Sequence, residues 1–240
     1  MSTSPPSHHD GLDLTDVDRA RGELVRAVRT LFAAGVMSHS GHGNISVRLR
    51  SSPEHVVLNR GDLLVAPADA DPTAGARVIS ADVVVVDLDG RVVLGEPGRF
   101  TAGITRMHTE VYRLRPDVGA IVHTHSPQAT GYAIAATPLP ARYEALLVHG
   151  QPVDVPVAPW GPRGSTEAVQ GIVDTFAAHP RTQAVLLANH GLLVAGNDAA
   201  HAARLVVAIE EAAVSTLAST TLGGPADLPP AARHEKPLAF

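Results

Sequence analysis

Apolar residues recur at helical spacing in four stretches of the chain, and three of these stretches begin near a residue that can cap a helix. In the first, Leu24, Val28 and Leu31 share one helical face, with Thr15 or Asp16 placed to cap the start and Gly35 to end it. The second must end before Pro116, because a proline ring clashes with the preceding helical turn. The helices are predicted over residues 14–35, 104–114, 165–178 and 198–220, with Ser165 placed to cap the third and Asn197 or Asp198 placed to cap the fourth.

Short runs rich in β-branched residues lie between these helices and are typical of strands. They cover residues 44–49, 55–58, 63–66, 83–88, 91–94, 118–125, 153–157 and 184–188. The connections among the first five are too short for helical crossovers, so these strands should pair antiparallel, with a turn at Asp89-Gly90. A mixed central sheet with helices packed on its faces is therefore expected, and an all-parallel sheet is not.

The length of 240 residues is enough for a single core, and we expect one domain over residues 14–224. The polar, Pro-rich stretch at residues 1–13 should be a disordered tail, and residues 225–240, rich in Pro and Ala, should extend over the surface.

The composition then limits which binding partners and which metal ligands are expected. The chain has 19 Lys and Arg against 24 Asp and Glu, so no basic excess favours nucleic acid or an anionic membrane. No segment approaches the roughly 18 apolar residues that a membrane span needs, and a cytoplasmic location is expected. Because cysteine is absent, the 13 histidines are the remaining candidates for soft metal ligands.

His123 and His125 stand two apart at the end of an apolar strand, so their side chains should point to the same face. His190 also follows an apolar strand directly, and Gly191 after it permits a sharp change of backbone direction. Three neutral imidazoles suit Zn, Fe, Ni, Cu or Co and leave positions open for water and substrate. The alternative is a surface pair or core histidines bonded to backbone.

Five motifs in order then resemble the class II aldolase/adducin family, and the similarity runs from about residue 16 to 224. They are Gly-Asn-Ile-Ser-Val-Arg at 43–48, His-Thr-Glu-Val-Tyr at 108–112, Arg-Pro-Asp-Val at 115–118, Val-His-Thr-His-Ser at 122–126 and Asn-His-Gly at 189–191. The resemblance implies a three-layer α/β/α sandwich and a ring-shaped homotetramer with active sites near subunit interfaces. It also implies one divalent metal per subunit on His123, His125 and His190; zinc is favoured, with iron, manganese or cobalt as alternatives.

The chain departs from the sugar-phosphate members of that family at two places. Where they carry Ser-Ser-Glu or Ser-Ser-Asp, it has Ala102-Gly103-Ile104, and Ile104 can neither ligate a metal nor transfer a proton. A second phosphate loop is replaced by residues 66–69, where the Asp69 carboxylate would repel an anion. A small, non-phosphorylated hydroxy or keto compound is therefore the predicted substrate.

Other polar and aromatic residues are candidates for the same site. Gly43 and Asn44 offer amide groups to a substrate oxygen, and Trp160 falls where the family often carries an aromatic near the pocket mouth. Glu144, a bound water or a residue of a neighbouring subunit would have to supply the catalytic acid or base missing at Ile104. His42 and Arg106 are further polar groups that could face the pocket.

Three functions remain open. The first is a metal-dependent carbon-carbon lyase of the aldolase or decarboxylase type, in which the ion polarises a carbonyl. The second is a non-haem Fe(II) oxygenase of the same fold acting on an aromatic keto or hydroxy acid, favoured by three histidines beside an apolar fourth position. The third is a non-catalytic, adducin-like module, and retention of all three histidines argues against it.

Overall fold

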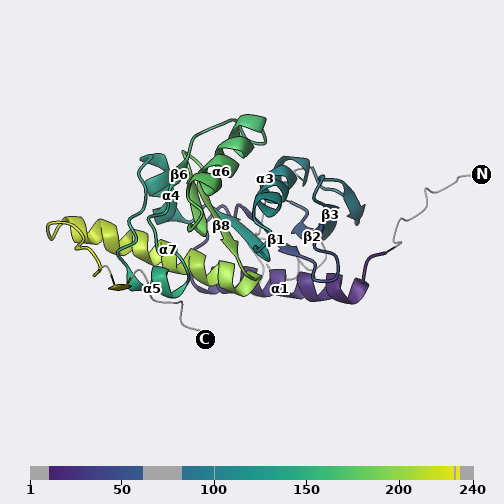
Figure 1. Ribbon diagram of the computed structural model, residues 1–240, viewed down its shortest axis with the longest axis horizontal. Helices are drawn as coiled ribbons and strands as arrows, with labels where there is room; N and C mark the ends of the chain where they lie inside the picture. Colours follow the sequence, from purple (N-terminus) through teal and green to yellow (C-terminus); the bar gives the residue numbers. More distant parts are fainter. Residues whose placement is uncertain (1–10, 62–82, 100, 230, 233–240) are drawn as a thin grey trace, which may run out of the picture.

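The computed structural model describes residues 11–61, 83–99, 101–229 and 231–232 (Figure 1). Its helices are α1 (Leu14–Ala33), α3 (Thr101–Leu114), α4 (Pro127–Ile134), α5 (Glu144–Val148), α6 (Thr166–Ala178) and α7 (Ala199–Thr220). Its strands are β1 (Gly43–Arg48), β2 (His55–Asn59), β3 (Val83–Asp87), β4 (Val92–Leu94), β5 (Ala120–Thr124), β6 (Val157–Ala158), β7 (Ala184–Leu187) and β8 (Gly191–Gly196).

The strands form one mixed sheet in the order β4-β3-β2-β1-β5-β8-β7-β6. Every neighbouring pair is antiparallel except β6 and β7, which are parallel. The predicted antiparallel pairing of the early strands is confirmed, since short connections such as the turn at Gly90 reverse the chain directly. β1 and β5 lie at the centre of the sheet, and they contain the Gly-Asn-Ile-Ser-Val-Arg motif and His123.

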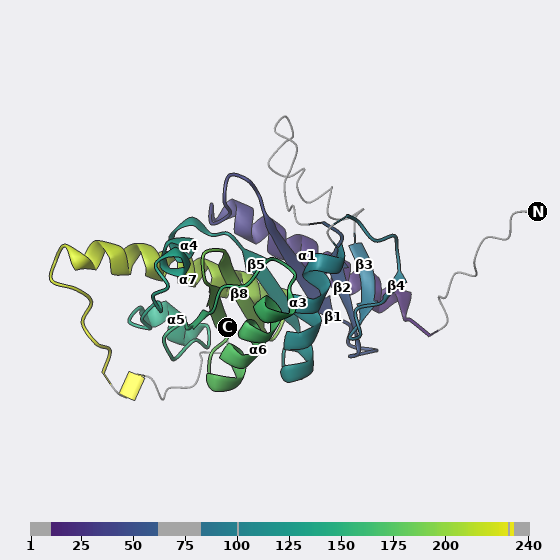
Figure 2. The same ribbon diagram turned by 90° about the horizontal axis from the view of Figure 1, so that it is seen from above.

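Helices cover both faces of this sheet, which confirms the expected three-layer sandwich. Figure 1 shows α1 and α7 running along one face, with α3 and α6 on the other; Figure 2 shows α3 and α6 next to each other over the sheet. Alternate residues of a strand enter opposite layers: Val122 of β5 packs on the α1 and α7 side, and Ile121 on the α3 and α6 side. Both faces of the central strands are therefore buried.

The helix ends follow from capping groups, with one correction. Ser165 and Asp198 cap α6 and α7 as predicted, each accepting a hydrogen bond from a backbone N–H of the first turn. α1, however, is capped by Asp13, whose carboxylate accepts from the backbone N–H of Thr15. Asp16 lies inside the helix, and its carboxylate instead holds Ser51.

Other differences concern short elements. The predicted strand at 153–157 is reduced to β6, because Pro156 has no N–H to donate and Val155 pairs only with Leu139. α4, α5 and β8 were not predicted, and the strand expected at 63–66 lies outside the described residues. Residues 225–229 form neither helix nor strand. Within the described part of the chain, no helix combines the length and apolar character required to span a membrane.

Candidate metal centre

The three predicted ligands come together from two neighbouring strands. His123 lies on β5 and His125 just beyond its end, so period-two geometry points both rings to the face covered by α3 and α6. His190 sits in the turn that joins β7 to β8, and β8 pairs with β5. This turn thus places the third ring over the end of the strand that supplies the other two.

The turn has a backbone suited to this placement. Asn189 adopts a φ of 57°, a left-handed conformation that asparagine tolerates better than most residues, and the His190 N–H donates to the carbonyl of Leu187 at 2.9 Å. Gly191 serves a different purpose from the one predicted. A β-carbon there would lie 2.5 Å from the Thr124 carbonyl oxygen, so glycine is required for close approach.

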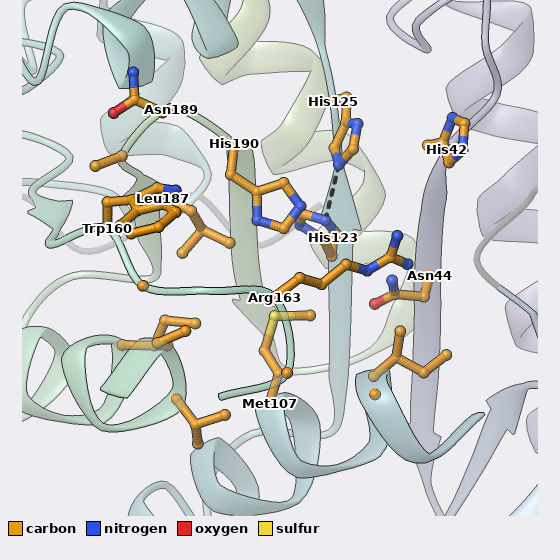
Figure 3. A pocket seen from close by; sticks show the side chains of 18 of the residues that line it. His42, Asn44, Met107, His123, His125, Trp160, Arg163, Leu187, Asn189 and His190 are labelled. Atoms are coloured by element: carbon orange, nitrogen blue, oxygen red, sulfur yellow. Dashed lines mark hydrogen bonds between the residues drawn. The ribbon is translucent and has the colours of Figure 1, made fainter. Parts of the chain in front are cut away.

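The rings face a common point (Figure 3). One ligand nitrogen from each of His123, His125 and His190 lies within 4.8 Å of those of the other two, and the ring centroids are 4.8–5.0 Å apart. The Nε2 atoms of His123 and His125 are 3.2 Å apart. Two nitrogens bound to one tetrahedral zinc at roughly 2.0–2.1 Å lie about 3.3 Å from each other, so this spacing fits a shared ion.

Hydrogen bonding and burial prepare the rings for a metal. His123 Nδ1 lies 2.9 Å from the backbone oxygen of Leu192; a carbonyl can only accept, so Nδ1 carries the proton and Nε2 presents its lone pair. Burial lowers the pKa of His123 well below its usual value, with His190 and His125 adding to the effect. Burial, and then the charge of Arg163, also lower the pKa of His190. Both rings are held neutral, the form that binds metal.

A pocket of about 540 Å³ opens beside the histidines, a volume typical of small-molecule sites. One side is apolar, formed by Ile104, Met107 and Leu187 together with Val169 and Ile172. The polar side holds the histidines and Asn44. Among the described residues lining this pocket there is no carboxylate, and Arg163 supplies a positive charge that favours an anionic ligand.

Arg163 is a functional candidate that the sequence analysis missed. It lies in the loop between β6 and α6, and Figure 3 shows its side chain extending across the pocket in the direction of Asn44. The charge of Arg163 lowers the pKa of His190, so it lies near the candidate metal ligands. Two glycines, Gly161 and Gly164, flank this part of the loop in a stretch without periodicity, so no pattern could have directed the side chain inward.

The substrate-binding candidates also reach this pocket. Gly43, Asn44 and His42 line it, and the His42 ring is stacked on His125 with centroids 5.9 Å apart. Trp160 lines it with 64% of its surface exposed, and in Figure 3 it lies on the other side of the histidines from Asn44. Its role in substrate binding, like that of Gly43 and Asn44, stays a prediction.

Two of the predicted site residues, Glu144 and Arg106, do not lie beside the three histidines in this chain. Glu144 is exposed at the first turn of α5 and is not among the residues lining the pocket. Arg106 donates to the hydroxyl of Thr166 on the surface. Ile104 does line the pocket, with 3% of its surface exposed. Its side chain therefore makes this part of the pocket wall apolar and offers no acid or base there.

Comparison with known proteins gives a consistent picture. Residues 22–217 match the model of the class II aldolase and adducin N-terminal domain family. The fold is also similar to a solved L-fuculose 1-phosphate aldolase, with a TM-score of 0.73 and 27% identity over 90% of this chain and 92% of that one.

Two curated relatives have similar length. A 5-deoxy-D-ribulose 1-phosphate aldolase of Bacillus thuringiensis is 31% identical over 217 residues, covering 89% of this chain and 91% of the relative. A methylthioribulose-1-phosphate dehydratase of Sorangium cellulosum is 32% identical over 214 residues, covering 83% and 92%. Both names specify a phosphorylated sugar, so the prediction of a non-phosphorylated substrate finds no support here.

Proposed function

Because this chain belongs to the class II aldolase and adducin family, as its match over residues 22–217 establishes, we propose that it is a metal-dependent lyase acting on a small sugar phosphate of the ketose 1-phosphate type. The observation that carries the proposal is the cluster of three histidines beside a pocket that has an arginine and, among its described lining residues, no carboxylate. The names of the curated relatives support the substrate class.

His123, His125 and His190 would hold the metal through one nitrogen each, with zinc favoured. When bound, a divalent ion supplies Lewis-acid stabilisation of negative charge on a carbonyl oxygen. The three rings leave room for substrate oxygens on the pocket side, which a catalytic site requires and a structural four-ligand site lacks.

The proposed reaction is a retro-aldol cleavage of the bond between C3 and C4. The proton on the C4 hydroxyl leaves, the C3–C4 electron pair moves toward the C2 carbonyl, and C4 departs as an aldehyde. Protonation of C3 then completes dihydroxyacetone phosphate, so no oxidant or reductant is needed. A substrate of the same class would instead be dehydrated if C3 lost its proton and C4 lost its hydroxyl as water.

A group must accept the proton from the C4 hydroxyl. Ile104 cannot, and Glu144 lies exposed outside this chain's pocket. We therefore propose water or a residue of a neighbouring subunit as the acceptor. Glu144 would serve only in the pocket of such a neighbour, within the homotetramer expected from the family.

The phosphate would lie on the polar side of the pocket. Arg163 offers a planar guanidinium that binds phosphate oxygens through paired hydrogen bonds, and Asn44 offers an amide. The apolar side formed by Ile104, Met107 and Leu187 would then receive the far end of the sugar. That end is better matched by a methyl or thioether than by a hydroxyl, because an unpaired hydroxyl buried there loses its hydrogen bonds to water.

The test is to incubate zinc-loaded protein with 5-deoxyribulose 1-phosphate and to follow the products by NMR. We expect acetaldehyde and dihydroxyacetone phosphate in equal amounts, loss of both after chelation, and recovery when zinc is restored. A diketone formed with loss of water would assign the dehydratase reaction instead. No turnover by fully metal-loaded protein would contradict the proposal and favour the adducin-like alternative.

Two further parts of the proposal concern assembly and location. A homotetramer with sites near its interfaces is supported by exposed apolar side chains such as Val214 and Leu217 on α7, and light scattering of the purified protein would test it. A cytoplasmic location is also proposed.

The Fe(II) oxygenase alternative predicts iron in freshly isolated protein and oxygen consumption with an aromatic keto acid.

A further inference from the structure

A buried polar cluster joins β1 to α3 next to the pocket. Asn44 and Ser46 are two apart on β1 and therefore face the same side of the sheet. His108 and Tyr112 are one helical turn apart on α3 and face β1. At most 2% of the surface of any of the four residues is exposed, so their polar atoms depend on one another for hydrogen bonds.

The contacts of His108 fix which of its two ring nitrogens carries the proton. His108 Nε2 lies 2.5 Å from Asn44 Oδ1, an oxygen that can only accept, so Nε2 carries a proton. Burial lowers the pKa of His108 to about 3, and the ring therefore has one proton at neutral pH. Nδ1 is left as an acceptor for the Ser46 hydroxyl at 2.7 Å.

Tyr112 closes the cluster at its far end. Its hydroxyl donates to the backbone oxygen of Ser46 at 3.1 Å and lies 2.9 Å from the Ser46 hydroxyl. Because His108 Nδ1 can only accept once Nε2 carries the proton, the Ser46 hydroxyl donates to it, so the direction of these hydrogen bonds is set from the Asn44 end.

These hydrogen bonds determine the orientation of the Asn44 amide. Its oxygen is committed to His108, so its two N–H groups point away from α3. Asn44 also lines the pocket and pairs directly across β1 and β5 with His123, whose ring lies on the same face. A hydrogen-bond donor is therefore presented beside the proposed metal ligands.

The geometry points to His108 as a positioning residue that fixes Asn44 with its N–H groups toward the pocket, where they donate to a substrate oxygen beside the three histidines. The identity of that substrate rests on the proposed function; the orientation of Asn44 does not. An amide free to rotate would present its oxygen about as readily as its nitrogen, and the oxygen would repel an anionic or enolic oxygen of the ligand.

The first part of the test is the tautomer. In metal-loaded protein with ¹⁵N-labelled histidine, the signals of His108 are assigned by their loss in His108→Gln. We expect a neutral ring protonated at Nε2 at pH 7 and still neutral at pH 5. A ring protonated at Nδ1, or one charged at pH 7, would overturn the proposal whatever the enzyme's activity.

The second part compares two matched variants. His108→Gln places an amide N–H near the position of Nε2 and keeps the donor to Asn44. His108→Asn places its amide near Nδ1 and keeps the contact to Ser46 alone. The readout is the affinity of metal-loaded protein for dihydroxyacetone phosphate, measured by calorimetry with metal content checked for every variant.

We expect about tenfold weaker binding in His108→Asn, near wild-type binding in His108→Gln, and no further loss when His108→Asn is added to Asn44→Ala. The cycle separates positioning from general destabilisation, because a structural loss would add to that of Asn44→Ala. Wild-type affinity in His108→Asn, or equal loss in both His108 variants, would overturn the proposal. If wild-type protein binds no dihydroxyacetone phosphate, the proposed reaction fails, and the tautomer alone decides the role of His108.

Discussion

Gly191 passes so close to Thr124 that a β-carbon at position 191 would lie 2.5 Å from the Thr124 carbonyl oxygen. The same β-carbon would lie 2.9 Å from Cδ2 of the His125 ring. The contact between β8 and the end of β5 is therefore set by the absence of a side chain, and the two segments that carry the three histidines are held together through it.

Gly191→Ala should lower both stability and metal affinity. Overpacking of this kind costs about 1–3 kcal/mol, and the shift needed to relieve it moves His125. Urea unfolding and metal content per chain measure the two effects. Gly103→Ala is the control, since a β-carbon there meets nothing within 4 Å and alanine suits the α3 helix better than glycine. Equal behaviour of the two variants would contradict this account of Gly191.

The pair of histidines on β5 was predictable because period-two geometry and an apolar strand fix both rings, whatever the surrounding fold. His190 was predictable as a strand-end residue, but the reason for Gly191 was not, since close approach depends on a strand 67 residues away in the chain. β8 was missed although Asn189 followed by Gly191 is a turn signal between two apolar runs. Reading that signal would have predicted the hairpin.

Side chains placed by loops and tertiary packing could not be assigned from sequence. Arg163 lies on an irregular loop whose path is set by contacts between that loop and α6, so no spacing indicated its direction. Glu144 was chosen for its chemistry, and the start of α5 instead puts it on the surface. α4 begins with Ser126 and Pro127, a start signal that was readable, but its eight residues are too few for a clear periodicity.

Asp16 should make stability depend on pH in the acid range. Burial alone would raise its pKa, but hydrogen bonds from the Ser51 N–H and hydroxyl and the ion pair with Arg19 outweigh this and lower the pKa to about 2 from 3.8. The folded-state pKa is depressed, so the stabilisation is present above pH 3.8 and is lost as pH falls through about 2.

Asp16→Asn should therefore reduce the free energy of unfolding by about 2 kcal/mol at pH 7, and the difference from wild type should shrink as pH falls from 4 toward 2. Chemical denaturation at several pH values measures this. Asp18→Asn is the control, because its ion pair with Arg21 is exposed and should contribute less than about 1 kcal/mol. A pH-independent difference for Asp16→Asn would contradict the assignment.

Glu210 should support the segment that follows His125. Its carboxylate, carried by α7 and 8% exposed, accepts the backbone N–H groups of Gln128 and Ala129 at 2.8 and 2.9 Å. Glu210→Ala leaves both donors without that partner and should cost about 1–3 kcal/mol of stability. Glu211→Ala removes an exposed carboxylate that contacts only the Tyr143 hydroxyl among the hydrogen bonds described, and should have little effect in thermal unfolding. Similar losses in both variants would argue against the capping role.

Arg163 should govern affinity for a phosphorylated ligand. Loss of a charge-assisted hydrogen bond costs about 1.5–3 kcal/mol, so Arg163→Met should weaken binding of dihydroxyacetone phosphate roughly tenfold to a hundredfold, and Arg163→Lys less. Arg106→Met is the control, since Arg106 lies outside the pocket. Calorimetry on metal-loaded protein compares them. Unchanged affinity in Arg163→Met would place the phosphate elsewhere.

The central claim is that His123, His125 and His190 hold one divalent metal ion, and metal analysis of freshly and anaerobically purified protein tests it most directly. We expect close to one ion per chain in wild-type protein and in the exposed-histidine control His39→Ala, and little or none in His123→Ala combined with His125→Ala. Zinc or manganese would fit the lyase and iron the oxygenase. Full metal content in the double variant would contradict the account.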